Sequence, residues 1–419
     1  MTTALSGVRV LDLSRVLAGP FVAQTLADLG ADVIKVERPV SGDESRAHGV
    51  RPSANLGLNK EDSSGFTAVN RGKRSIALNL ARSEGQEIAR RLACQCDVII
   101  ENFKTGDLQR YGLDYKTLSA LNPSLIYCSI TGFGQTGPYA SFPGYDLIFQ
   151  AMSGLMAVTG GPDGEPGGGP QRVGYSVADA NAGLYAVIGI LAALYHRTAH
   201  DGRGQHIDIA LVEAQIAAMT VVASGFQITG KVPPRAGNIS PISCPYQPFK
   251  CADGMLVVTV NNERQFKNLC QVLGFPDVAL DPRFATNALR VQHKDVLLPL
   301  VSEAMLKIPV NECRRLLLEA GVPCGPVNDL GQAFADEQIR YREIWKEVNH
   351  PEKGRTPIIA SPLRLSETPV EYRLAPPSLG EHTALVLTDI LNMDPNEISS
   401  LADRGIVGLA NQERQGRVP

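Results

Sequence analysis

One aspartate, Asp179, is the residue of this chain most suited to covalent chemistry. It stands between a glycine-rich run, 160–169, and an uncharged apolar run, 182–195, which predicts a buried helix. Aspartate is among the preferred N-terminal caps of helices, so a capping role is one interpretation. The other interpretation is a carboxylate that attacks a substrate at a cleft.

The glycine-rich run 160–169 has two interpretations of its own. A flexible loop beside a reacting group can close over it and exclude water. An ordinary surface turn has the same composition, so the sequence leaves this choice open.

Cationic side chains lie next to the predicted strands, where an open α/β sheet binds its ligands. Arg38 follows the second strand, and the run 70–75 contains Arg71, Lys73 and Arg74 directly before the third. The segment after the fourth strand adds Asn102, Phe103 and Arg110. Cations, an amide and an aromatic face suit a ligand that carries a base and phosphates. A solvated surface loop contains the same residue types.

Several other chemistries lack their motifs. The first strand–helix junction, 12–20, has no Gly-x-Gly-x-x-Gly, which disfavours NAD and FAD. The chain also contains no Walker A sequence, no serine nucleophile elbow and no His/Cys set spaced for a metal. His196 and His200 are better explained by a helix C-terminus and a solvated site. We therefore expect no metal.

The elements that must position these residues alternate between strand and helix. Strand-like runs at 8–13 and 31–36 enclose a helical run at 20–29. The pattern continues with strands at 75–80, 97–100 and 125–130. This alternation predicts the α/β class, with a doubly wound, mostly parallel, Rossmann-like sheet.

A second, smaller α/β domain is expected in the middle of the chain. The composition changes to proline, glycine and polar residues around 229–238, which marks a linker. Asp253-Gly254 separates two strand-like runs and predicts a hairpin. We assign residues 1–225 and 330–419 to the large domain and 226–329 to the small one.

Composition limits the partners and the compartment. The 40 basic and 43 acidic residues give a net charge of -3, which argues against a nucleic-acid partner. The eight cysteines are scattered, as expected for free thiols in a reducing cytosol. The N-terminus has no apolar leader, and the run 182–195 is too short to span a bilayer. We expect a cytoplasmic protein that does not enter a membrane.

Ordered motifs along nearly the whole chain resemble the class III CoA-transferase family, of the formyl-CoA transferase and carnitine CoA-transferase type. They include Arg15-Val-Leu-Ala-Gly-Pro, Gly30-Ala-Asp-Val-Ile-Lys-Val-Glu-Arg-Pro, Glu101-Asn-Phe, Gly144-Tyr-Asp, and Asp179 with Gly183. The resemblance implies that coenzyme A thioesters are the substrates. It also implies a homodimer whose two chains interlock like linked rings.

Carried over by position, the resemblance makes Asp179 the nucleophile. CoA would be bound by Arg38, Lys73, Arg74, Asn102, Phe103, Arg110 and Tyr145. The carboxylate would attack an acyl-CoA thioester and form a mixed anhydride and then an aspartyl-CoA thioester, which an acceptor acid consumes. A helix N-terminus would favour the ionised carboxylate that this attack requires.

Two rival functions stay open. A sister branch of the family racemises 2-methylacyl-CoA thioesters, but it carries histidine where this chain has Tyr145. The ordinary pKa of a tyrosine, about 10, makes it a poor base at neutral pH, so the transferase is favoured. The other rival is a non-catalytic CoA-binding protein.

The substrate is expected to be a dicarboxylate. The formyl and oxalate enzymes carry glutamine where this chain has Leu17 and tryptophan where it has His48, so formate and oxalate are doubtful. The runs around Arg15 and 242–250 look closer to transferases of the succinyl-CoA:glutarate type. We expect succinyl-CoA as the donor and an acid such as glutarate as the acceptor, with Arg15 binding its distal carboxylate.

Overall fold

The computed structural model describes residues 3–51 and 63–410. They form two compact units. The larger comprises the described residues within 1–155, 173–227 and 342–419, and the smaller comprises 156–172 and 228–341. The domain limits predicted at 226 and 329 stay a prediction, because compact units are groups of contacting residues and need not fold or move independently.

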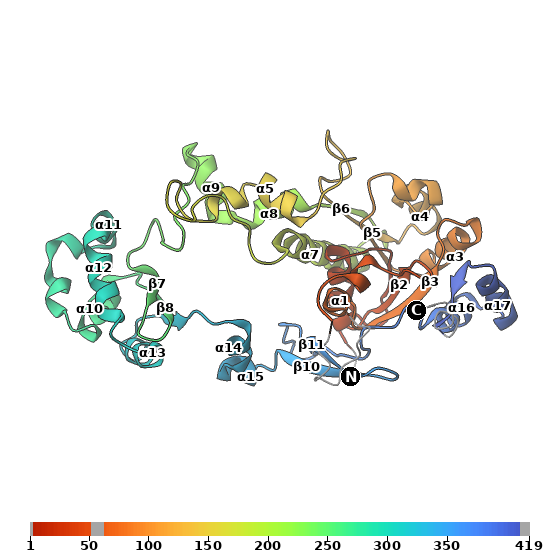
Figure 1. The fold of residues 1–419 in the computed structure, drawn as a ribbon. Coiled ribbons are helices and arrows are strands. Elements are labelled where there is room, and N and C mark those ends of the chain that lie inside the picture. The colour runs from red at the N-terminus through yellow and green to blue at the C-terminus, as the bar shows by residue number, and fades with distance from the viewer. Residues whose placement is uncertain (1–2, 52–62, 411–419) are drawn as a thin grey trace. The chain divides into compact units, whose positions relative to one another are not determined.

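The larger unit is built on a seven-stranded sheet with the order β12-β3-β2-β1-β4-β5-β6 (Figure 1). Its strands are β1 Arg9–Asp12, β2 Asp32–Glu37, β3 Lys73–Leu78, β4 Val98–Glu101, β5 Ile126–Thr131, β6 His206–Ala210 and β12 Val407–Gly408. All neighbouring pairs are parallel except β12 with β3. The predicted α/β class with a mostly parallel sheet is confirmed. Strand order reverses at β1, and such a switch point is where open α/β sheets bind ligands.

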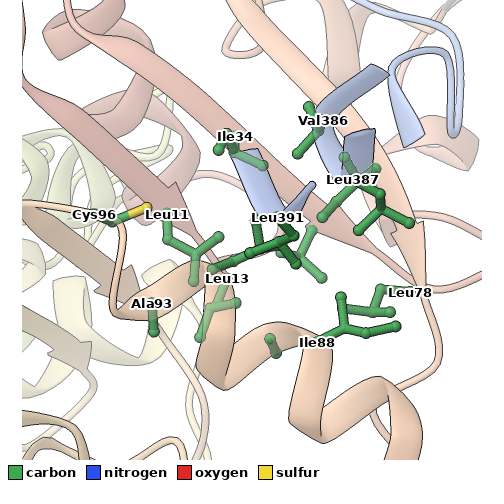
Figure 2. Packing of buried hydrophobic residues seen from close by; sticks show 14 of the residues in the cluster. Leu11, Leu13, Ile34, Leu78, Ile88, Ala93, Cys96, Val386, Leu387 and Leu391 are labelled. Carbon is green, nitrogen blue, oxygen red and sulfur yellow. The ribbon is translucent and has the colours of Figure 1, made fainter. Parts of the chain in front are cut away.

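Helices cover both faces of this sheet because successive strand residues point to opposite faces. Val10 and Val33 face the core formed with α1 (Ala18–Asp28) and α7 (Val177–Ala199). Figure 2 shows the opposite core, where Leu11, Leu13 and Ile34 meet side chains of two other helices. These helices are α3 (Ser83–Ala93) and α16 (Thr383–Leu391).

The remaining helices of the larger unit are short, or bent, or lie at its edge. They include α4 Tyr115–Leu121, α5 Asp146–Met152, α8 Leu211–Ala218, α9 Thr220–Thr229 and α17 Pro395–Asp403. Helices α8 and α9 follow each other with an 82° bend between them. Thr220 has φ 36°, which a continuous right-handed helix does not contain.

The smaller unit has its own sheet and core. Antiparallel strands β7 (Tyr246–Lys250) and β8 (Met255–Thr259) confirm the predicted hairpin, and β9 (Cys324–Pro326) pairs with β8. Helices α10 (Glu263–Val272) and α13 (Val310–Glu319) contribute Leu269 and Leu317 to the buried cluster against them. The eight cysteines of the chain are all free, as predicted.

Helix α7 is longer than the sequence suggested. By length and composition its 23 residues could cross a membrane, as could the bent pair α8 and α9 taken together. Only 44% of the apolar window of α7 is buried. Its buried face, with Ala182, Ala186 and Ile190, packs in the sheet core as predicted, while Leu184 and Ile188 are exposed.

Candidate active site

Asp179 lies in the first turn of α7 but does not cap it. The N-cap residue is Ser176, and the helix begins at Val177. Within the described part of the chain, the Asp179 carboxylate accepts no hydrogen bond, and its side chain is only partly exposed. The capping interpretation is therefore wrong, and an unengaged carboxylate remains for chemistry.

A second aspartate, Asp146 at the start of α5, takes the capping role. Its Oδ1 accepts the backbone N–H groups of Ala178 at 2.8 Å and of Asp179 at 3.3 Å. Gln150 Nε2 donates to the other oxygen of Asp146 at 2.6 Å. Asp146 belongs to the motif Gly144-Tyr-Asp, but the sequence alone indicates no role for it. Its partner lies 32 residues further along the chain, so only the motif itself could have marked it.

The pKa of Asp179 is raised to about 7, first by burial and then by the negative charge of Asp146. This direction is opposite to the one expected from a helix N-terminus. The reason is that Asp146 occupies the N–H groups that would have stabilised the Asp179 charge and adds a like charge nearby. Asp179 is therefore poised between acid and carboxylate near neutral pH.

Helix α7 brings Asp179 toward the loop that joins β1 to α1. Gly183, one turn after Asp179 on the same face, lies so close to α1 that a Cβ there would be 2.7 Å from Phe21 Cδ1 and 3.4 Å from Ala18 O. Ala18 is the first residue of α1 and directly follows the loop 14–17. The packing of Gly183 thus orients the Asp179 face of α7 toward this loop.

The loop 14–17 is held in an unusual conformation by polar side chains from other segments. Val16 has φ 68°, in the left-handed region that β-branched residues rarely adopt. Asn102 accepts from Arg15 N at 2.8 Å and donates to Arg15 O at 2.7 Å. Asp43 accepts from Val16 N at 3.2 Å, and Lys35 donates to Ser14 O at 3.0 Å. Strain of this kind is typical of functional loops whose surroundings fix them.

A pocket of about 220 Å³ opens at the carboxyl ends of β1 to β4. It brings together four residues that the sequence singled out: Arg15, Arg38, Phe103 and Arg110. The Arg15 guanidinium lies 5.0 Å from the centre of the Phe103 ring and pairs with Glu44 at 2.7 Å. Arg38 and Arg110 are mostly exposed, so their guanidinium groups are accessible to a ligand.

Lys73 and Arg74 lie away from this pocket. Lys73 is fully buried, and its Nζ donates to Asp12 Oδ2, Pro20 O and Asn70 Oδ1 at 2.8 to 2.9 Å. An ammonium has three donors, so none is left for a phosphate. Arg74 makes two hydrogen bonds to Asp32. This geometry argues against the phosphate-binding role that the resemblance implied for the pair.

The other residues implied by the resemblance lie around these features. Asn102 clamps the loop 14–17, as described above, and Leu17 is the N-cap residue of α1. Tyr145 is the N-cap residue of α5 and is 77% exposed, and His48 is also exposed. The glycine-rich run 160–169 belongs to the smaller unit, where Gly160 and Gly169 have the positive φ of turn glycines. Among the described residues, no group of side chains is arranged to hold a metal.

Comparison with known proteins identifies the family of this chain. The model of "CoA-transferase family III" matches residues 5–383. The chain belongs to this family. The resemblance drawn from the sequence is thereby confirmed.

Similar proteins cover almost the whole chain. The succinate–glutarate CoA-transferase of Agrobacterium fabrum is 45% identical over 92% of this chain and 95% of its own length. The succinyl-CoA:glutarate CoA-transferase of Mus musculus is 40% identical over 96% of this chain and 90% of its own. A crystal structure of a CAIB/BAIF family protein from Brucella suis is 41% identical with a TM-score of 0.82, covering 93% of this chain and 100% of that one.

Proposed function

We propose that this CoA-transferase moves CoA from succinyl-CoA to a dicarboxylate, with glutarate as the acceptor, and that Asp179 carries the acyl group. The observation that supports this role is the carboxylate of Asp179 in the first turn of α7, which accepts no hydrogen bond from the described residues. The names of the relatives support the choice of substrates. We expect the reaction to take place in the cytoplasm.

The first half-reaction transfers the thioester to the enzyme. An Asp179 oxygen attacks the succinyl carbonyl, a C–O bond forms, the C–S bond breaks, and CoA thiolate leaves. The thiolate then attacks the Asp179 carbonyl of the mixed anhydride and releases succinate. The aspartyl-CoA thioester that remains conserves the energy of the original thioester.

The second half-reaction runs the same steps in reverse. A glutarate carboxylate attacks the Asp179 carbonyl and expels CoA thiolate. The thiolate then attacks the glutaryl carbonyl, which gives glutaryl-CoA and restores the Asp179 carboxylate. Charge and atoms balance without a net proton or water. Water must be kept from the anhydride, and we propose that the glycine-rich run 160–169 contributes to this exclusion.

We propose that the pocket at β1 to β4 holds the nucleotide end of CoA. Phe103 offers a face for adenine, and Arg38 and Arg110 offer accessible cations for phosphates. Arg15 lies in the same pocket and pairs with Glu44, so its placement supports a role beside CoA more than contact with the distal carboxylate of glutarate. Leu17 and His48 stay our candidates for shaping the acyl site.

We also propose that the enzyme is an interlocked homodimer. Helices of the larger unit carry large exposed apolar side chains, which a partner subunit would cover. They are Leu147, Ile148 and Met152 on α5, Leu184, Ile188 and Tyr195 on α7, and Val221 and Phe226 on α9. Light scattering after gel filtration gives the mass directly, and a monomeric active enzyme would contradict this proposal.

The decisive experiment traps the covalent intermediate. Enzyme mixed with succinyl-CoA is treated with hydroxylamine or borohydride, and the peptide that contains Asp179 is examined by mass spectrometry. We expect this peptide to be modified in the native enzyme, while Asp179→Asn stays folded, binds CoA and transfers nothing. An unmodified peptide from an active enzyme would rule out the mechanism. Deuterium exchange at carbon 2 of a branched acyl-CoA would instead indicate the racemase.

A further inference from the structure

A second pocket, of about 380 Å³, lies beside the CoA pocket in the larger unit. The segment 101–111 lines both: Phe103 and Arg110 face the CoA pocket, and Glu101 and Gln109 face the second one. The floor of this second pocket comes from β4, β5 and β6. Neither the fold nor the proposed reaction accounts for the polar groups gathered there.

Three neighbouring side chains cross this floor: Glu101, Ser129 and His206. Ser129 Oγ lies 2.9 Å from His206 Nε2, and Ser129 is the register partner of Glu101 on the adjacent strand. Burial raises the pKa of Glu101 to about 7. The His206 ring is fixed in place by stacking on Tyr115, with ring centres 4.9 Å apart. The floor is therefore preorganised rather than mobile.

The unsatisfied groups that line this second pocket are hydrogen-bond donors. Gln135 Nε2 is shielded from solvent and has no hydrogen-bond partner among the described residues. Lys104 and Lys116 are exposed, and neither forms an ion pair with a described residue. Two acids also line the pocket: Glu101, and Asp114, which caps α4 and accepts from Thr117 Oγ1 at 2.7 Å. Two cations without ion-pair partners, Lys104 and Lys116, and the unpaired amide donor of Gln135 favour a ligand that only accepts hydrogen bonds.

We propose that this pocket, the Gln135 pocket, binds a small carboxylate anion of the class that the transferase consumes and releases. The anion class follows from Gln135, Lys104 and Lys116. The choice of a dicarboxylate such as glutarate rests on the proposed function. One carboxylate would accept from the Gln135 amide, while the lysine ammonium groups would neutralise the other.

An anion bound in the Gln135 pocket would also affect the CoA pocket. The Glu101 side chain accepts a hydrogen bond from the backbone N–H of Phe103 at 2.8 Å. The Arg15 guanidinium lies over the Phe103 ring. The next residue, Asn102, clamps the loop 14–17 through Arg15. A carboxylate beside Glu101 favours the protonated acid, which weakens the bond to Phe103 N–H. Free substrate or product acid thus changes the affinity of the enzyme for the CoA thioester.

The test is equilibrium dialysis of isotope-labelled glutarate against the full-length protein with free CoA present. Lys104→Ala/Lys116→Ala and Gln135→Leu are compared with the wild type and with Lys267→Ala/Lys294→Ala. The control pair removes the same charge from exposed positions of the smaller unit. Inorganic phosphate is titrated in a separate arm.

We expect one class of glutarate sites to weaken by about tenfold or more in both Gln135-pocket variants, as the loss of charge-assisted hydrogen bonds implies, and not in the control. The affinity for free CoA, measured in the same dialysis, should then depend less on added glutarate. Unchanged glutarate binding in both variants would overturn the proposal. Phosphate that binds more tightly than glutarate at this site would overturn the carboxylate assignment. The measurement needs no turnover, so its failure would leave the Asp179 mechanism intact.

Discussion

Asp146 and Asp179 divide between them the two roles that an aspartate can play at a helix N-terminus. Asp146 accepts the N–H of Asp179 at 3.3 Å, while the carboxylate of Asp179 itself accepts no hydrogen bond from the described residues. A capping carboxylate is stabilised as an anion and made a weak nucleophile. The arrangement therefore spares Asp179 from capping and, by adding a like charge, raises its pKa to about 7.

Removing the charge of Asp146 should shift the pH dependence of the reaction. In Asp146→Asn the amide oxygen can still accept the N–H groups, but the like charge is gone, so the pKa of Asp179 falls. The acid limb of kcat/KM for succinyl-CoA should move to lower pH, because Asp179 attacks as the carboxylate. A pH–rate profile measures this shift. The control Asp295→Asn, in the smaller unit, should leave the profile in place.

The same pKa predicts how Asp179 affects stability. Its folded-state pKa, about 7, lies above the ordinary 3.8, so its contribution is fully present below pH 3.8 and is lost as the pH rises through 7. Asp179→Asn removes this loss. The variant should therefore exceed the wild type in free energy of unfolding at pH 8, by on the order of 4 kcal/mol, and match it near pH 4. Urea titrations at the two pH values test this, and equal differences at both would contradict the raised pKa.

Substitutions of Lys73 and Arg38 should have different effects, the first on the stability of the fold and the second on the binding of CoA. Lys73→Ala leaves Asp12 buried without its partner, which typically costs about 3–5 kcal/mol, so the variant should be poorly folded. Arg38→Ala removes an exposed cation and should keep its stability while the KM for succinyl-CoA rises about tenfold. Urea unfolding and steady-state kinetics on both variants measure the two effects. A stable Lys73→Ala with weakened CoA binding would restore the phosphate role that the resemblance implied.

These residues also mark how far the sequence alone could predict the site. The strand–helix alternation identified the sheet, and the order of parallel strands then brings Arg38, Phe103 and Arg110 to one pocket, as the sequence suggested. Lys73 shows the limit, because a lysine at a strand start looks the same whether it faces solvent or the core. The φ of Val16 and the role of Asp146 depend on contacts between segments far apart in the chain, which no local pattern encodes.

The contact between α7 and α1 gives a last prediction, based on two glycines. Replacing a helical glycine by alanine usually stabilises a helix by about 0.5–1 kcal/mol. In Gly225→Ala, on α9, the new Cβ meets nothing within 4 Å, so activity should be unchanged. In Gly183→Ala the Cβ would lie 2.7 Å from Phe21 Cδ1, so either the Phe21 ring or α7 must shift, and we predict that α7 shifts and carries Asp179 with it. A displacement of about 1 Å at a reacting group can cost up to about a hundredfold in rate, so kcat should fall far more than stability.

Stopped-flow transfer from succinyl-CoA, compared between the two variants, measures this. Equal rates would show that the position of Asp179 does not depend on the close approach of these helices.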